Sequence, residues 1–114
     1  MEVIAIEDQI KQVFLNLIQN AEESITEGGG TLTIKTRVVG SSAEIRVQDT
    51  GTGILPENLE LIFEPFYTTK GAVKGTGLGL SVSYGIIKAA GGDIQVQSEP
   101  GKGSVFITTL PGGL

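Results

Sequence analysis

Neither cysteine nor histidine occurs in the 114 residues of this chain. Without cysteine the chain can form no disulfide, no thiolate metal site and no thiol nucleophile. Without histidine it contains no imidazole general base, no zinc–histidine site and no histidine that could accept a phosphoryl group. The missing cysteines fit a reducing compartment, and we expect a cytoplasmic protein.

Long apolar runs and an excess of positive charge are also missing. There is no run of about 18 apolar residues and no basic leader before an apolar segment, so the sequence predicts neither a membrane span nor a signal peptide. Eight basic residues stand against 13 acidic ones, a formal charge of −5, which disfavours general attraction to nucleic acid or anionic lipid. We expect no nucleic-acid partner and no direct membrane contact, while a membrane anchor elsewhere in a parent protein stays open.

The length of the chain is enough for one hydrophobic core, so we expect a single domain over residues 1–114. We also expect this domain to be monomeric. Apolar residues recur at helical spacing after Asp8 and predict an amphipathic helix that ends before Gly28. Alternating patterns and turn residues predict the remaining elements: strands over 31–38, 43–48, 93–98 and 104–110, a further strand over 3–6, a short helix over 56–62 and a long helix over 78–90. Because helices and hairpins do not alternate strictly, we expect an α/β two-layer sandwich with a mixed, mostly antiparallel sheet and helices on one face.

A glycine-rich run, Gly-Thr-Gly-Leu-Gly-Leu at 75–80, follows a polar loop and opens the second long helix. The backbone N–H groups at a helix N-terminus bind phosphate readily, so this run indicates a nucleotide. Glycines alone are explained equally well by a turn. Lys70 and Lys74 in the preceding loop are natural counter-charges for a polyphosphate, and the aromatic residues of segment 63–67 are suited to anchoring that loop.

Three side-chain amides, from Gln12, Asn16 and Asn20, are spaced by four residues on the first predicted helix. They form a stripe beside its apolar face and could be ordinary polar flank residues. Asparagine is, however, a mediocre helix former, so two of them in mid-helix suggest a task. Carboxamide oxygens are suitable ligands for Mg²⁺.

An aspartate with two glycines, Asp49-Thr50-Gly51-Thr52-Gly53-Ile54, follows the second predicted strand. The segment could be only a turn. It could also be a recognition edge, because a fixed carboxylate can accept a hydrogen bond from the exocyclic amine of adenine and glycine lets a flat ring approach the backbone. The acidic ligands of an EF-hand are missing.

Four ordered segments closely resemble the ATP-binding domain of sensor histidine kinases. Residues 12–21 (QVFLNLIQNA), 49–54 (DTGTGI), 63–66 (FEPF) and 75–80 (GTGLGL) are similar to its N box, first glycine box, F box and second glycine box. The likeness extends through Gly91-Gly92 to residues 101–106 and covers nearly the whole chain.

This resemblance implies the Bergerat fold, in which ATP lies between the helices and a flexible lid. It implies that Asn20 coordinates Mg²⁺ and that Asn16 assists at the phosphates, both as catalytic residues, and that Asp49 reads the adenine amine. The other nucleotide-binding residues that it implies are Gly51, Gly53 and Ile54 at the base, Lys70 in the lid, and Gly75, Thr76, Gly77, Leu78 and Gly79 at the phosphates.

Some positions depart from the family pattern. Glu23 stands where many members carry a lysine, Ser24 where an aromatic residue is frequent, and Ile6 where an acidic residue is usual. The lid segment between Lys70 and Gly75 is short. The loss of the lysine contact leaves more of the phosphate charge to Lys70 and Lys74.

Relatives of this fold that hydrolyse ATP carry a glutamate at the position of Asn16, and a carboxamide cannot act as a general base for water. The resemblance therefore implies a histidine kinase that donates the γ-phosphoryl group to a histidine on a separate dimerisation domain, with a response regulator as the partner of the full-length protein. A serine protein kinase of the anti-sigma type and a non-catalytic, nucleotide-dependent binding module remain the alternatives.

Overall fold

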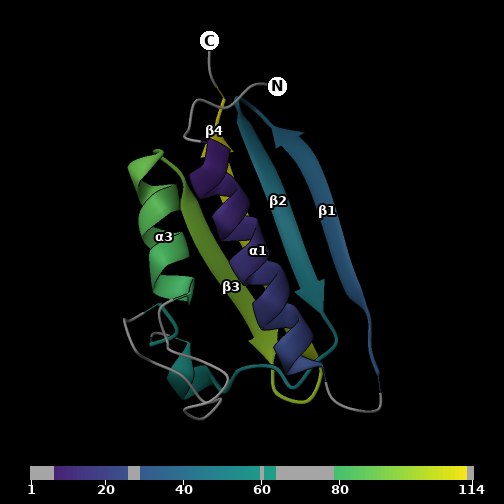
Figure 1. Cartoon of the computed structure of the whole chain (residues 1–114). Coiled ribbons are helices and arrows are strands. Elements are labelled where there is room, and N and C mark those ends of the chain that lie inside the picture. Colours follow the sequence, from purple (N-terminus) through teal and green to yellow (C-terminus); the bar gives the residue numbers. More distant parts are fainter. Residues whose placement is uncertain (1–6, 26–28, 60, 64–78, 113–114) are drawn as a thin grey trace.

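The computed structural model describes residues 7–25, 29–59, 61–63 and 79–112. Two helices lie on one face of a four-stranded sheet (Figure 1). The elements in chain order are helix α1 (Glu7–Ser24), strands β1 (Leu32–Val39) and β2 (Ser42–Asp49), the 3-10 helix η1 (Pro56–Asn58), helix α3 (Gly79–Ala89) and strands β3 (Asp93–Glu99) and β4 (Gly103–Pro111). The predicted two-layer α/β fold is confirmed.

The sheet has the strand order β1-β2-β4-β3, and each of its neighbouring pairs is antiparallel. The register pairs Asp49 with Ser104 and Ser104 with Ser98, so three chain segments meet at one end of the sheet. Both predicted hairpins are present. The predicted strand over 3–6 lies outside the described residues.

Alternate residues of β2 and β4 face the helices, because successive side chains in a strand point to opposite faces. On β4 these are Phe106 and Leu110, and on β2 Val47, all of them buried. They pack with Val13, Leu17 and Ala21, which lie four residues apart on α1 and are also buried, and with Ile87 of α3. One core therefore joins both helices to the sheet.

Helix α3 ends in a hydrogen-bonded glycine cap, as the glycine pair predicts. Gly91 adopts a positive φ of 84°, its N–H donates to the carbonyl of Lys88, and the N–H of Gly92 donates to the carbonyl of Ile87. These two bonds form a Schellman motif, which satisfies carbonyls at the end of the helix. The cap turns the chain directly into β3, so α3 runs antiparallel to that strand and begins at the end of the sheet where Asp49 lies.

The predicted helix over 56–62 is shorter in the structure. Its described turns close through bonds between residues three apart: Asn58 N–H to Leu55, Leu59 N–H to Pro56 and Leu61 N–H to Asn58. Such bonds give the tighter 3-10 geometry, which does not extend over long runs. Among the described residues of this range, Pro56–Asn58 is the part that forms a regular element.

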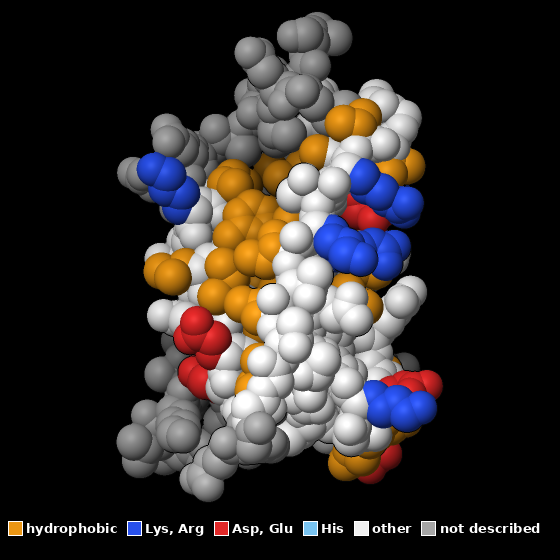
Figure 2. All heavy atoms as spheres, turned by 90° about the vertical axis from the view of Figure 1, so that its right-hand side faces the viewer, with side chains coloured by type: hydrophobic (Ala, Val, Ile, Leu, Met, Phe, Trp, Pro, Cys, Tyr) orange, Lys and Arg blue, Asp and Glu red, His pale blue; other side chains and the backbone are white. Residues whose placement is uncertain are grey.

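Strand β1 lies at the edge of the sheet, and two of its apolar residues on the helix side are largely exposed, whereas Leu32 packs against the core. Ile34 is 50% exposed and Val38 62% exposed. Figure 2, which views the molecule from the β1 side, shows an apolar surface on the side where α1 lies. On the opposite face of the sheet, Glu44 accepts hydrogen bonds from Arg37 at 2.9 Å and from Arg46 at 2.8 Å.

Candidate functional site

Asp49, the last residue of β2, is buried on the helix side of the sheet and is only 2% exposed. Its Oδ1 accepts a hydrogen bond of 2.9 Å from the N–H of Gly51, while its Oδ2 is buried and has no partner in the described part of the chain. A buried carboxylate oxygen without a donor costs free energy, about 1–3 kcal/mol or more. The oxygen is therefore suited to a donor group that a ligand brings.

The segment after Asp49 is held against the turn between β3 and β4. The N–H of Gly101 donates to the carbonyl of Thr52 at 2.8 Å, and the N–H of Ile54 donates to Ser98 Oγ at 2.7 Å. Gly53 has a φ of +73°, and a Cβ there would overlap the carbonyl of Glu99. A close backbone contact thus explains why glycine stands at this position. Whether Gly51 and Gly53 also lie beside a base stays a prediction.

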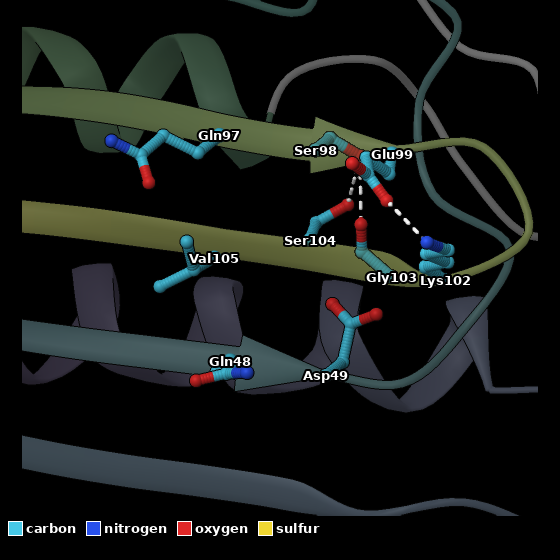
Figure 3. Close-up of a pocket in the computed structure, with 9 residues that line it drawn as sticks. All are labelled: Gln48, Asp49, Gln97, Ser98, Glu99, Lys102, Gly103, Ser104 and Val105. Atoms are coloured by element: carbon cyan, nitrogen blue, oxygen red, sulfur yellow. Dashed lines mark hydrogen bonds and ion pairs between the residues drawn. The ribbon is translucent and has the colours of Figure 1, made fainter.

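A serine pair, which the motifs in the sequence do not reveal, lies beside Asp49. Ser98 Oγ donates to the carbonyl of Gly103 at 3.0 Å and lies 2.8 Å from Ser104 Oγ (Figure 3). Both serines are on the helix side, where an alternating pattern expects apolar residues, and that irregularity was the available signal. With Asp49 they are among the residues around a hollow of about 440 Å³ at the ends of β2, β3 and β4, whose lining also includes Gln48, Gln97 and Val105 from the opposite face of the sheet.

The predicted amide stripe on α1 is present and faces α3. Gln12 Nε2 donates to Asn16 Oδ1 at 2.7 Å, and Asn16 Nδ2 donates to Ser83 Oγ of α3 at 3.1 Å. Ser83 is fully buried, whereas Asn16 and Asn20 are half-buried. The stripe therefore runs along the contact between the helices, toward the end of the molecule where α1 ends and α3 begins.

The remaining predicted residues fall largely outside the described ranges. Lys70, Lys74 and residues 75–78 are among them, while Gly79 is the first residue of α3. Of the aromatic segment the structure describes Phe63, whose ring stacks on Tyr84 with a centroid distance of 5.0 Å and meets Phe106 edge-on at 6.4 Å. Phe63 is thus joined to the core, while the expected anchoring of the following loop lies outside the described residues.

The described ranges contain neither a metal-binding cluster of side chains nor a membrane-spanning helix. They contain no group of three or more histidine, cysteine, aspartate and glutamate side chains that could hold a metal ion. Neither α1 nor α3 is a helix that could cross a membrane by its length and apolar character.

Comparison with known proteins identifies the family to which the chain is similar. Residues 5–113 match the family model described as histidine kinase-, DNA gyrase B-, and HSP90-like ATPase. The chain is 48% identical to sporulation kinase C of Bacillus subtilis (strain 168) over 105 residues, and 43% identical to sensor histidine kinase ZraS of Escherichia coli (strain K12) over 110 residues. These alignments cover 92% and 96% of the chain but 24% and 23% of the two relatives, so the chain spans about a quarter of their length.

A solved structure has the same fold. The catalytic domain of histidine kinase ThkA superposes with a TM-score of 0.82 at 39% identity, over 96% of this chain and 70% of that one. The family match, the relatives and the fold agree with the family that the four sequence motifs predict. The chain therefore belongs to the family of histidine kinase-, DNA gyrase B- and HSP90-like ATPases, as an ATP-binding catalytic domain of the sensor histidine kinase type.

Proposed function

We propose that this chain is the phosphoryl-donating domain of a two-component sensor kinase, which binds ATP with Mg²⁺ in the cytoplasm and delivers the γ-phosphoryl group to a histidine of a separate dimerisation domain. The observation that carries the nucleotide site is the buried Oδ2 of Asp49, which has no hydrogen-bond partner among the residues that the structure describes. The exocyclic amine of adenine is a donor of the kind that this acceptor lacks. The residues of Gly51 to Ile54 form the fixed wall beside it.

The amides of α1 are the proposed metal and phosphate ligands. Mg²⁺ prefers a few oxygen ligands from the protein and fills its other positions with water and phosphate oxygens. The carboxamide oxygens of Asn20 and Asn16 fit that preference, and the described residues offer no carboxylate cluster in their place. When bound, the metal would neutralise charge on the phosphates during transfer. Gly75 to Gly79 and Lys70 would complete the phosphate contacts.

Transfer to a protein acceptor is favoured over hydrolysis. Asn16 stands where ATP-hydrolysing relatives carry a glutamate, and a carboxamide cannot take a proton from water. The sequence contains no histidine, so the acceptor imidazole must come from outside these 114 residues. In the transfer, the bond between the γ-phosphorus and the bridging oxygen breaks, a P–N bond to the imidazole forms, and ADP leaves. The response regulator would then receive the phosphoryl group from that histidine.

The proposal is tested by mixing the chain with radiolabelled ATP, Mg²⁺ and a separately produced dimerisation domain of a homologous sensor kinase. We expect label on the dimerisation domain that is lost in acid and retained in base, as a phosphohistidine requires. A dimerisation domain with its histidine changed to alanine is the control. Acid-stable label on a serine would instead indicate a serine kinase, and ATP binding without transfer to any acceptor would indicate a binding module.

The adenine contact has its own test. Asp49→Asn replaces an acceptor oxygen by an amide and should lower the preference for ATP over GTP, because an amide N–H cannot accept from the amine of adenine. Isothermal titration with both nucleotides measures the preference. Asp93→Asn, at the far end of the sheet, is the matched control and should leave it unchanged. An unaltered preference in Asp49→Asn would refute the assignment of Asp49 to adenine.

A further inference from the structure

A closed set of hydrogen bonds surrounds the hydroxyl of Ser98. It receives the N–H of Ile54 at 2.7 Å, donates to the carbonyl of Gly103 at 3.0 Å and lies 2.8 Å from Ser104 Oγ. A serine hydroxyl has one proton to donate and two lone pairs to accept with. The bond to Gly103 uses the proton, because a carbonyl can only accept. One lone pair holds the Ile54 N–H, and one lone pair remains.

The remaining lone pair determines the direction of the contact between the serines. If Ser98 donates to Gly103, the hydrogen bond between the hydroxyls must have Ser104 as its donor. The reverse direction would take the proton of Ser98 away from Gly103 and leave that bond unmade. Buried polar groups are found hydrogen-bonded in the great majority of cases, and Ser104 is only 7% exposed. The arrangement that makes all three bonds is therefore favoured.

Ser104 is left with lone pairs only. It is the direct cross-strand partner of Asp49 on the helix side of the sheet, and Cβ atoms of such partners lie about 4.5–5.5 Å apart. Among the described residues, Asp49 Oδ2 is also an acceptor without a donor. Two acceptor oxygens from neighbouring strands thus stand side by side, and neither supplies a proton to the other in the structure.

We propose that Ser98 is a positioning residue that determines the specificity of the site. Because Ser98 accepts the hydrogen bond of the Ser104 hydroxyl, Asp49 and Ser104 can only accept hydrogen bonds from a ligand. Such a pair selects a purine with an amino group at C6 over a purine with a carbonyl at C6. An amino group offers two N–H donors to this pair. A carbonyl oxygen at the same place would face two acceptors and leave them unpaired, which is the kind of mismatch that discriminates strongly. The inference rests on the proposed adenine site.

The experiment compares ATP with inosine triphosphate, which differs from ATP in carrying a carbonyl at C6 and a proton on N1. Both are titrated calorimetrically into the 114-residue chain, its Ser98→Ala and Ser98→Cys variants, and Asp49→Asn. We expect the wild type to bind ATP more tightly by tenfold or more. Ser98→Ala releases the Ser104 proton, which can then donate to the carbonyl, so the preference should fall by about tenfold, chiefly through tighter binding of inosine triphosphate.

Val96→Ala provides the control for a merely structural effect. Val96 is half-buried on the same strand and the same face, two residues from Ser98, and has no polar group. It should lower the unfolding midpoint without changing the ratio of the two affinities. Ser98→Cys keeps the side-chain size but forms only weak hydrogen bonds, so it should reproduce the fall if the alanine variant does not fold.

The outcomes separate the two proposals. If Asp49→Asn loses the preference while both Ser98 variants keep that of the wild type, the inference on Ser98 is wrong and the adenine site stands. If the wild type does not distinguish ATP from inosine triphosphate, both are wrong. An equal fall in Val96→Ala would also overturn the inference, since it would assign the effect to stability.

Discussion

Thr108 carries a second buried oxygen without a hydrogen-bond partner in the described part of the chain, besides Asp49 Oδ2. Its side chain is fully buried on the helix side of β4, between the cross-strand partners Ile45 and Ile94. Nothing in that apolar setting points to a ligand, unlike the surroundings of Asp49. A buried oxygen without a partner is therefore a proposed ligand contact at Asp49, whereas at Thr108 it only lowers the stability of the fold.

Thr108→Val should stabilise the protein. Valine has nearly the shape of threonine and removes the unsatisfied hydroxyl, whose burial costs about 1–3 kcal/mol. We expect the urea midpoint to rise by an amount equivalent to about 1 kcal/mol, with an unchanged m value. Thr109→Val, half-buried on the opposite face, should have the smaller effect. A fall in the midpoint of Thr108→Val would show that the hydroxyl is hydrogen-bonded in solution.

Asn20→Ala should abolish the dependence of nucleotide affinity on Mg²⁺, because the proposed site has few other oxygen ligands. Titrations of ATP with Mg²⁺ and with EDTA measure this dependence. Gln19→Ala, the exposed neighbour on α1, is the matched control and should behave as the wild type. A normal response to Mg²⁺ in Asn20→Ala would refute the metal role.

Secondary-structure elements with local signals could be predicted from the sequence. The spacing of Val13, Leu17 and Ala21 gave the buried face of α1, and the pair Gly91-Gly92 gave the end of α3. The serine pair could not be predicted, because the contact between Ser98 and Ser104 depends on the cross-strand register. It also depends on the hydrogen bond from Ile54 to Ser98, two residues that are 44 positions apart in the chain. Register of this kind depends on the whole sheet.

The β1–β2 hairpin carries an ion cluster whose stability should depend on pH. Hydrogen bonds from Arg46, and then from Arg37, hold the pKa of Glu44 below its ordinary value of 4.5. The folded state thus binds this proton less tightly than the unfolded chain does. The contribution of Glu44 to stability is present above that value and is lost as the pH falls through the lowered pKa.

The thermal midpoint of Glu44→Gln should therefore lie below that of the wild type near neutral pH, and the gap should close as the pH falls below 4.5 and through the lowered pKa of Glu44. Glu57→Gln, an exposed change in η1, should show no such closing gap. Because the cluster lies on the face of the sheet away from the helices, ATP affinity should not change. A gap that is constant with pH would exclude the ionised carboxylate as its cause.

The junction between the segment after β2 and the β3–β4 turn depends on one glycine. Gly53→Ala places a Cβ against the carbonyl of Glu99, whereas Gly101→Ala meets open space at a similar φ of +80°. Both variants incur the backbone cost of about 1–2 kcal/mol, and Gly53→Ala should lose clearly more. Urea unfolding measures both. Equal losses of unfolding free energy in the two variants would show that the backbone at Gly53 and Glu99 can move apart without a loss of stability.

At the scale of the whole molecule, a single buried cluster joins α1, α3 and the sheet. A domain with one core is expected to unfold in one cooperative step. Phe106 lies at the centre of this cluster: it is 1% exposed and meets Phe63 edge-on. We therefore expect neither helix to remain folded when the sheet unfolds.

Phe106→Ala should lower the free energy of unfolding by about 3–5 kcal/mol, a large part of the stability of a small domain. Its far-UV circular dichroism and tyrosine fluorescence transitions in urea should shift together, the fluorescence being measured in a Tyr67→Phe background so that it reports Tyr84 on α3. Val39→Ala at the exposed sheet edge should cost much less. Transitions that separate would show that the helices and the sheet unfold independently.

The pairing of Asp49 with Ser104 also makes the ligand a reporter of correct folding. A strand that slips by one residue turns all of its side chains to the other face. In a molecule whose β2 had slipped against β4, the carboxylate of Asp49 would point away from the helices, and a nucleotide at the proposed site would find no acceptor. At the proposed site, nucleotide binding should therefore shift the population toward molecules with the native register by mass action.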